Sequence, residues 1–329
     1  MAIPMEQMTN KINNNKGKVL VTGGAGFIGS TIVDLLVDNG YKVVIADSMI
    51  TGDNRNINPK AAFYQADITD IGQLDNIFRK EKPNLVVHTA AQINVRWSVE
   101  KPQFDANVNI IGTINILECC RKHGVKKIAY SSTGGALYGE PKYMPCDEKH
   151  PINPICHYGA SKFSAEHFFY VYHCIYGVNY IILRYSNVYG PRQNPKGEAG
   201  VISIFLDKLM KKEQPKIFGD GKQTRDFVYS GDVARANLLA LQKNPDLSQE
   251  FKIFNIATGT EASVNEIYSE LRSILKSDTE AAHTDAVPGE VRHISLDAKH
   301  AEKYLGWKPE VGFKEGLKRT AEWFLKGHG

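Results

Sequence analysis

The feature that most restricts the possible folds is a glycine-rich segment between a short apolar strand and a helical pattern. Residues 18–22 read KVLVT, and the next seven residues read GGAGFIG. Glycines let the backbone turn tightly and approach a phosphate, which then lies at the positive N-terminus of the following helix. The segment therefore predicts a parallel α/β sheet that opens with a dinucleotide-binding unit, whose candidate contacts are Gly23, Gly26, Phe27, Ile28 and Gly29.

A second apolar strand, residues 41–47, ends in Asp47, which lies 24 residues after Gly23. This is close to the spacing at which a dinucleotide-binding unit places its ribose-binding carboxylate. A carboxylate there accepts hydrogen bonds from ribose hydroxyls and repels a 2′-phosphate, so we predict NAD and not NADP. Arg55 leaves the alternative open, because a nearby arginine is the usual partner of a 2′-phosphate.

Two further strands continue the alternation and end in residues that suit cofactor contacts. Residues 61–68 end in Asp67 and Ile68, where an adenine could be contacted. The next strand is wholly apolar, as expected when both faces are buried, and it leads to Ala90 and Ala91, whose small side chains allow close approach of a cofactor. This alternation of strands and helices predicts a doubly wound parallel Rossmann sheet.

Hydroxyl side chains close the fifth predicted strand, at residues 131–133. The carboxyl ends of parallel strands face the ligand crevice, so Ser132 and Thr133 are candidates for the site. Tyr158 and Lys162 follow at i and i+4 of a predicted helix and share one face. A nearby ammonium favours the phenolate and lowers a phenol pKa from about 10, which makes a base. The pair alone is weak, because the spacing also arises by chance.

Beyond residue 183 the strict alternation fades, which predicts two domains and a tail. We expect a mobile tail over residues 1–16 and an NAD-binding Rossmann domain over residues 17–183, with a return near residues 225–258. Residues 184–329 then form a smaller mixed α/β domain for the substrate.

Composition excludes several other classes of protein. The net charge is only +4 with dispersed basic residues, so no nucleic-acid surface is expected. The five cysteines lack metal-ligand spacing, so we expect no metal. No apolar run reaches transmembrane length and the first 16 residues have no signal-like core, so we expect no membrane association and a cytoplasmic location.

The predicted helix over residues 158–176 is apolar around most of its circumference. Such a helix needs a partner besides its own sheet. With the helix predicted over residues 105–123 it could form an intersubunit bundle, which predicts a homodimer. Packing within one subunit is the alternative.

Several motifs together resemble the extended short-chain dehydrogenase/reductase superfamily, and within it the nucleotide-sugar epimerases, most closely the UDP-glucose 4-epimerases. The resemblance spans residue 18 to about residue 309. It rests on residues 22–29, 131–133, Tyr158 with Lys162, 184–192, 219–221 with 225–227, and 289–292.

The resemblance implies a tightly bound NAD and a UDP-sugar substrate. Tyr158 would deprotonate the sugar 4-hydroxyl, Lys162 would hold the nicotinamide ribose, and Thr133 or Ser132 would hydrogen-bond the reacting oxygen. Asn187, Arg225 and Arg292 fall where this family binds phosphate and nucleotide. Ile294 falls where residue size excludes or admits a 2-acetamido group, and isoleucine leaves both sugars open. The residues to which the resemblance assigns substrate contacts are Asn187, Arg225, Arg292 and Ile294.

Departures from the family pattern reduce the number of reactions that this chain could catalyse. The 4,6-dehydratases carry an Asp-Glu pair where this chain has Gly134 and Gly135, so dehydration is not expected. The leading hypothesis is interconversion of UDP-glucose and UDP-galactose, with the N-acetylhexosamine pair also open. The alternatives are a UDP-glucuronate 4-epimerase or decarboxylase, and a non-catalytic NAD-binding regulator, against which the intact Tyr158, Lys162 and Thr133 argue.

Overall fold

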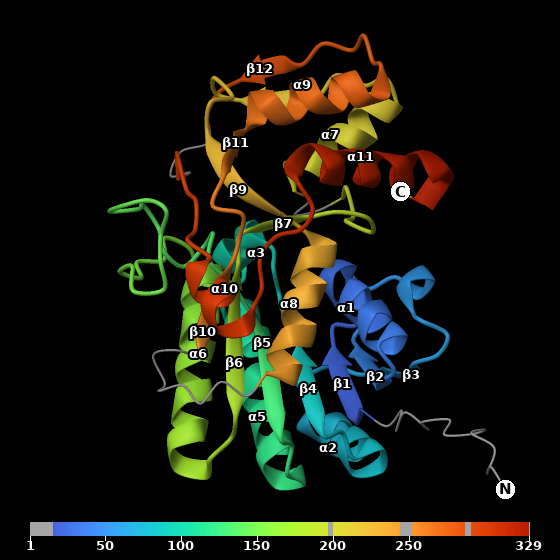
Figure 1. Cartoon of the computed structure of the whole chain (residues 1–329), viewed down its shortest axis with the longest axis vertical. Helices are drawn as coiled ribbons and strands as arrows, with labels where there is room; N and C mark the ends of the chain where they lie inside the picture. Colours follow the sequence, from blue (N-terminus) through green and yellow to red (C-terminus); the bar gives the residue numbers. More distant parts are fainter. Residues whose placement is uncertain (1–15, 197–199, 244–251, 287–290, 329) are drawn as a thin grey trace, which may run out of the picture.

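A seven-stranded parallel sheet organises the larger part of the chain (Figure 1). The computed structural model describes residues 16–196, 200–243, 252–286 and 291–328, so all of the predicted tail except Lys16 lies outside the described residues. The strand order is β10-β6-β5-β4-β1-β2-β3, and every pair of neighbours is parallel. The strands are β1 Lys18–Thr22, β2 Lys42–Asp47, β3 Ala62–Gln65, β4 Leu85–His88, β5 Lys127–Thr133, β6 Tyr180–Tyr185 and β10 Ile253–Ile256. The predicted Rossmann fold is confirmed.

The strand order reverses between β1 and β4, and this reversal positions the site. The chain runs outward from β1 through β2 to β3, and then returns to pair β4 with the other edge of β1. The crevice above such a switch point is where open α/β sheets bind ligands. Here the two loops meet closely: a Cβ added to Gly23 would lie 2.8 Å from the backbone nitrogen of Ala90.

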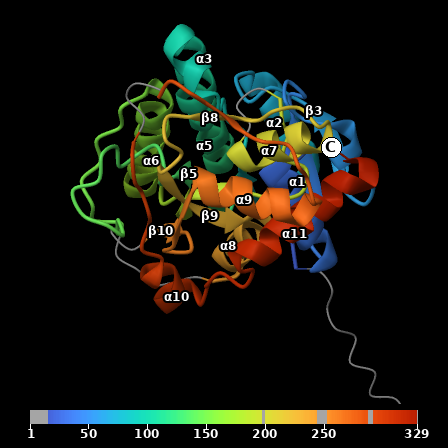
Figure 2. The same cartoon turned by 90° about the horizontal axis from the view of Figure 1, so that it is seen from above.

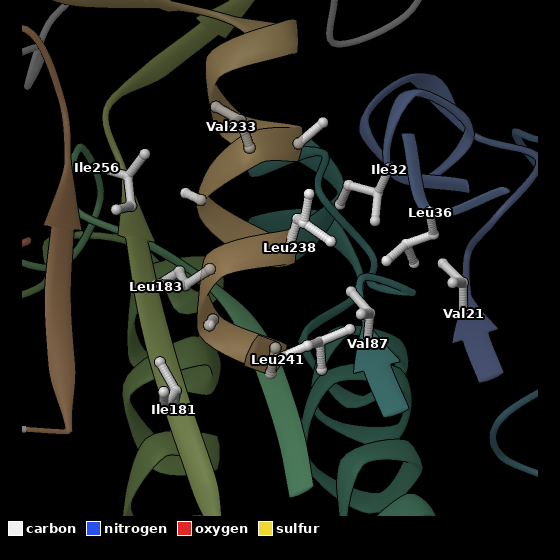
Figure 3. Close-up of a cluster of buried hydrophobic side chains, with 14 of the residues drawn as sticks. Val21, Ile32, Leu36, Val87, Ile181, Leu183, Val233, Leu238, Leu241 and Ile256 are labelled. Carbon is white, nitrogen blue, oxygen red and sulfur yellow. The ribbon is translucent and has the colours of Figure 1, made fainter. Parts of the chain in front are cut away.

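Helices cover both faces of this sheet and bury its two apolar surfaces. Figure 3 shows α8 packed between β6 and α1, with Leu238 and Leu241 among the side chains of the cluster. The helices of this face are α1 Phe27–Asp38, α8 Ser230–Gln242 and α10 Lys299–Leu305. Those of the other face are α2 Ile71–Glu81, α5 Gly112–His123 and α6 His157–Tyr176.

Three elements differ from the sequence-based expectation. The predicted helix over residues 105–123 is a continuous helical run of α4 Pro102–Ala106, a π-helical turn Asn107–Ile111, and α5. The third strand is shorter than predicted, because Asp67 turns the backbone by accepting a hydrogen bond from the Thr69 amide at 2.8 Å. A short helix, α3 Val95–Glu100, was not predicted; Asn94 caps it by accepting from the Trp97 amide at 2.7 Å.

A smaller unit stands on the carboxyl ends of the large sheet (Figure 1). Figure 2 shows α7, α9 and α11 lying side by side over it. They pack on two small sheets of order β11-β9-β7 and β12-β8 around a second apolar core. Its elements are β7 Asn187–Tyr189, α7 Val201–Met210, β8 Lys216–Phe218, β9 Thr224–Tyr229, β11 Glu261–Ser263, α9 Val264–Leu275, β12 Ala282–Thr284 and α11 Phe313–Trp323. A helical turn, Phe324–His328, follows α11, and another, Asn54–Asn56, lies between β2 and β3 of the large sheet. Strands β11 and β12 were not expected from the sequence pattern.

A buried aspartate joins the two parts. Asp226 of β9 is 1% exposed and accepts hydrogen bonds from the amides of Thr258, Gly259 and Leu296 at 2.9, 2.8 and 3.3 Å. Burial raises its pKa, and the donors act in the opposite direction. The smaller unit is therefore fixed to the loop that leaves β10. Within the described residues, no helix is long and apolar enough to cross a membrane.

Candidate active site

The glycine loop has no room for side chains at two of its positions. Gly23 has φ +70°, which favours glycine, and a Cβ on Gly29 would lie 2.0 Å from the carbonyl oxygen of Gly23. The loop feeds α1, which begins at Phe27 with Gly26 as its N-cap and no side-chain cap. The amides of the first turn are thus free of a competing side chain, which suits an anion such as a pyrophosphate.

Asp47 lies beside this loop, at the end of β2. It is 7% exposed, and its Oδ2 accepts a hydrogen bond from the Ala25 amide at 2.9 Å while Oδ1 accepts from the Met49 amide at 2.9 Å. Arg55 forms an exposed ion pair with Asp53, with Nη2 2.7 Å from Oδ2. An arginine held by its own acid is not preorganised for a 2′-phosphate, so the residues present fit NAD.

The other predicted cofactor residues lie in the loops that follow β3 and β4, at the same edge of the sheet as the glycine loop. Asn115 of α5 fixes the loop after β3, donating to the Ile68 carbonyl at 3.0 Å. Asp67 beside it is half-buried. Ala90 and Ala91 are half-buried and follow β4 directly, against the glycine loop. The fold therefore assembles four separate loops of the sequence at one edge of the sheet.

Tyr158 lies in the first turn of α6, near the side chain of Thr133 at the end of β5. Burial raises the pKa of Tyr158, and the charges of Cys156 and Asp105 act in the same direction, whereas the Thr133 side chain acts in the opposite direction. The candidate base and a candidate hydroxyl therefore lie close together. Lys162 is not among the groups that shift the Tyr158 pKa in this structure. That Lys162 lowers this pKa therefore stays a prediction.

Lys162 is buried one turn further along α6. Its side chain is 3% exposed and its Nζ lies 4.2 Å from the centroid of the Tyr130 ring. Burial lowers the Lys162 pKa to about 7, and the carboxylates of Glu166 and Asp105 oppose that shift. Near neutral pH, small changes around Lys162 therefore change its charge.

Ser132 and Thr133 point to different partners. The Ser132 hydroxyl donates to Glu166 Oε1 at 2.6 Å, and both residues are buried. Successive side chains alternate along a strand, so Thr133 does not share the direction that Ser132 takes toward Glu166 in the body of α6. This arrangement favours Thr133 as the hydroxyl beside Tyr158.

A buried polar network behind Tyr158 and Lys162 was not predicted. Asp105 accepts hydrogen bonds from Gln92 Nε2 at 2.8 Å and Asn109 Nδ2 at 3.1 Å, and Asn109 also donates to the Ser161 hydroxyl at 3.1 Å. Asn109 lies in the π-helical turn, which often marks functional positions. In sequence these residues look like ordinary helix-surface polars, so only packing identifies them.

The predicted substrate residues lie on the smaller unit and the adjoining loop. Asn187 begins β7 beside Gly135, whose added Cβ would lie 3.4 Å from Asn187 Oδ1. Arg225 of β9 donates to the Thr224 carbonyl at 2.8 Å, and Arg292 Nη2 lies 2.6 Å from Asp220 Oδ2. Gly289 and Glu290 lie outside the described residues.

Ile294 is more deeply buried than a cleft-lining side chain would be. It is 2% exposed and packs in an apolar cluster with Tyr138, Val291 and Leu296. Leu296 in turn fills the space beside Gly134, where an added Cβ would lie 2.3 Å from its methyl group. The role of Ile294 in sugar choice stays a prediction.

Comparison with known proteins places the chain in one family. The NAD dependent epimerase/dehydratase family matches residues 19–257. A relative from Methanocaldococcus jannaschii, which carries the name of a UDP-glucose 4-epimerase, is 55% identical over 93% of this chain and 97% of its own length. The structure of UDP-glucose 4-epimerase from Thermotoga maritima with UDP-glucose is 45% identical, with a TM-score of 0.91 over 95% of this chain and 100% of that one.

The NAD complex of UDP-glucose 4-epimerase from Thermus thermophilus is 40% identical, with a TM-score of 0.88 over 94% of this chain and 99% of that one. The family, this likeness and the fit of Asp47 to a ribose agree on the cofactor, which is NAD. The chain therefore belongs to the NAD dependent epimerase/dehydratase family, as a nucleotide-sugar epimerase of the extended short-chain dehydrogenase/reductase type.

Proposed function

We propose that this protein interconverts UDP-glucose and UDP-galactose by oxidation and re-reduction at the sugar C4. The observation that supports this most is the placement of Tyr158, Lys162 and Thr133 together at the carboxyl ends of the strands, beside the loops that suit NAD. The reaction needs a base, a hydrogen bond to the reacting oxygen, a hydride acceptor and an anion clamp, and the chain offers residues for each.

Tyr158 takes the proton of the 4-hydroxyl and later returns it to the same oxygen. Thr133 holds that oxygen by a hydrogen bond while its charge changes. When bound, NAD supplies the chemistry of hydride acceptance and return. Lys162 holds the nicotinamide ribose and, when protonated, favours the Tyr158 phenolate electrostatically. The 4-keto sugar turns about its diphosphate between the two transfers, so the stereochemistry at C4 is inverted without net redox change.

The first oxidation at C4 could also lead to dehydration or to the reactions of a uronic acid substrate, and each of these needs groups of its own in the site. Elimination of water needs an acid and a base next to Thr133, and Gly134 and Gly135 supply neither. A uronic acid substrate would need an extra cation near the sugar C6. UDP-glucuronate epimerisation and decarboxylation are therefore the second candidates. The N-acetylhexosamine pair also remains a candidate substrate, because the size of Ile294 excludes neither sugar.

The deciding experiment is incubation of the purified protein with UDP-galactose, UDP-N-acetylgalactosamine and UDP-galacturonate in separate samples, with products identified by NMR. We expect UDP-glucose from the first. Conversion of the galacturonate alone would replace the proposal with the uronic acid alternative, and conversion of none would leave the NAD-binding regulator. Released NAD is measured after denaturation in each case.

Replacing Arg292 by Ala is expected to weaken binding of the nucleotide sugar. A charge-assisted hydrogen bond to phosphate contributes about 1.5–3 kcal/mol, so KM should rise roughly 10- to 100-fold with kcat changed much less. Arg319→Ala is the matched control: Arg319 is also half-exposed in this unit and pairs with Glu315 at 2.7 Å. Equal KM values for wild type and Arg292→Ala would remove Arg292 from the clamp.

The proposal includes a homodimer through α4, α5 and α6. Exposed or half-exposed side chains recur at alternating intervals of three and four along the α4–α5 run, which is the spacing of helices that pack in bundles. They are Phe104, Asn107, Ile111, Ile114, Glu118 and Arg121. On the neighbouring α6, Tyr170 and Val171 are 48% and 40% exposed. A second copy would cover both stripes in one four-helix contact.

Replacing Ile111 by Glu should therefore convert the dimer into a monomer. Ile111 is 47% exposed near the middle of this stripe, and burying a carboxylate there without a partner is costly. Sedimentation velocity measures the change. Ile71→Glu, at a 49% exposed isoleucine on α2, should sediment as the wild type does; a monomeric wild type would contradict the proposal.

A cytoplasmic location is also part of the proposal. No cysteine among the described residues forms a disulfide, and Cys119, Cys120 and Cys146 are buried, which suits a reducing compartment. Cell fractionation with an antibody to the protein tests it.

A further inference from the structure

A buried ion pair lies directly behind the proposed catalytic residues. Tyr158, Lys162 and Glu166 follow at i, i+4 and i+8 on one face of α6. Glu166 pairs with Arg184 of β6, with Nη2 2.6 Å from Oε2 and Nε 3.0 Å from Oε1. The side chains of Glu166 and Arg184 are only 3% and 2% exposed.

The pair binds to the strand that carries the proposed catalytic hydroxyl. Ser132 donates to Glu166 Oε1 at 2.6 Å, so the last part of β5 is fixed to the third turn of α6. On the opposite face of the sheet, the Ser131 hydroxyl lies 2.9 Å from the Tyr185 hydroxyl. The Ser131 and Ser132 hydroxyls are thus both bonded elsewhere, which leaves Thr133 as the hydroxyl residue at the end of β5 that is available to the site.

Further hydrogen bonds connect the same pair to the loop between β5 and α6. Arg184 Nη1 donates to the Tyr138 hydroxyl at 3.1 Å, and Tyr138 donates to Asn255 Oδ1 at 2.9 Å. Asn255 Nδ2 in turn donates to the carbonyls of Cys146 and Asp297 at 3.0 and 3.2 Å. This network, Ser132–Glu166–Arg184–Tyr138–Asn255, therefore joins β5, α6, β6 and β10 and the loop that contains Gly134 and Gly135.

We propose that Glu166, held by Arg184, is a positioning residue for the epimerisation: it turns the Ser132 hydroxyl away from Tyr158 and places a negative charge behind the Lys162 ammonium. This inference rests on the proposed function. It assigns Thr133 as the hydroxyl that contacts the reacting oxygen, and it gives the third residue on this face of α6 an electrostatic role.

The electrostatic part follows from the surroundings of Lys162. The charged or titratable groups around it come from β4, α4, β5 and α6 and are His88, Asp105, Tyr130, Tyr158 and Glu166. Burial drives the Lys162 pKa down to about 7, whereas Glu166 and Asp105 raise it. Burial also lowers the pKa of His88 to about 3, so His88 is neutral near pH 7 and adds no charge. Removing the Glu166 charge should therefore make Lys162 lose its proton at lower pH.

The double variant Glu166→Leu with Arg184→Met tests this electrostatic role. Removing Glu166 alone would leave a buried unpaired guanidinium, whereas replacing both charges by apolar groups of similar size often preserves folding. Two effects are expected. The Lys162 titration midpoint, read by NMR of 13C-labelled lysine and assigned with Lys162→Met, should fall by about one pH unit. The alkaline limb of the kcat profile should move down with it, while KM changes by less than about twofold.

Two single variants test the positioning of the hydroxyls. Ser132→Ala should lower kcat by less than about threefold, whereas Thr133→Val should lower it by roughly 100-fold, the effect of losing one preorganised donor. Asp232→Asn is the control for a general loss of stability: Asp232 is also buried, accepting from the amides of Glu310 and Val311 at 3.1 and 3.0 Å. It should lower Tm without moving the Lys162 midpoint.

An unchanged Lys162 midpoint in the folded double variant would overturn the electrostatic role, and a loss in Ser132→Ala as large as in Thr133→Val would overturn the positioning. The titration needs no substrate. If the protein converted no UDP-hexose, the proposed function would fail while the Lys162 titration still decided this inference.

Discussion

Replacing Tyr158 by Phe should lower kcat by about 10³-fold, equivalent to about 4 kcal/mol of transition-state stabilisation, because general-base catalysis contributes roughly 10²- to 10⁴-fold. The change removes one oxygen from a residue in the first turn of α6 and leaves the ring to pack as before. Bound NAD and the affinity for UDP should stay near wild-type values. Single-turnover measurement of the 4-keto intermediate separates the loss of chemistry from a loss of binding.

Tyr176→Phe is the control for this substitution. Tyr176 is the last residue of the same helix and its side chain is 51% exposed, so its hydroxyl is far along α6 from the first turn. We expect wild-type kcat for it. Retention of more than a tenth of the activity by Tyr158→Phe would mean that another group removes the proton.

Replacing Gly29 by Ala should abolish retention of NAD. The added Cβ would meet the Gly23 carbonyl oxygen at 2.0 Å and the Thr89 hydroxyl at 2.9 Å, so the glycine turn, which we propose holds the pyrophosphate, must move. Overpacking of this kind costs about 1–3 kcal/mol of folding free energy. The NAD content of the purified protein, measured by absorbance after denaturation, and Tm report the two effects.

Gly312→Ala is the matched control, because no atom lies within 4 Å of a Cβ added there. Its φ is −65°, which any residue adopts. This variant should keep its NAD, with only a small fall in Tm because Gly312 is the N-cap of α11 and alanine caps a helix less well. A Gly29→Ala protein that purified with a full complement of NAD would show that the loop can shift without losing the pyrophosphate contacts.

The large sheet and the cofactor loops could be predicted because their signals are local. A strand, a glycine turn and a helix within residues 18–39 dictate a ligand site at the switch point, and the apolar run 85–87 of the fourth strand dictates burial on both faces. The strands of the smaller unit were harder to predict from the sequence. Strands β11 and β12 have three residues each, and their partners β9 and β8 are remote in sequence, so no periodicity identifies them.

The choice between Ser132 and Thr133 shows what local sequence lacks. Both are hydroxyl residues at the end of one strand, and the family resemblance fits either. The structure places the buried Glu166 against Ser132, so the two hydroxyls differ through a residue 34 positions away. The network of Asp105, Gln92 and Asn109 was missed for the same reason, because Gln92, in the loop after β4, meets Asp105 and Asn109 only when that loop packs against the helical run of α4.

The sequence by itself determined the fold class, the candidate cofactor loops, and the i, i+4 pairing of Tyr158 and Lys162, since each depends on residues a few positions apart. Only the tertiary structure decided that Lys162 is buried with a pKa near 7 and that Asp226 joins the two parts of the molecule. Burial and electrostatic environment depend on which distant segments pack together, and a residue's neighbours in sequence do not specify them.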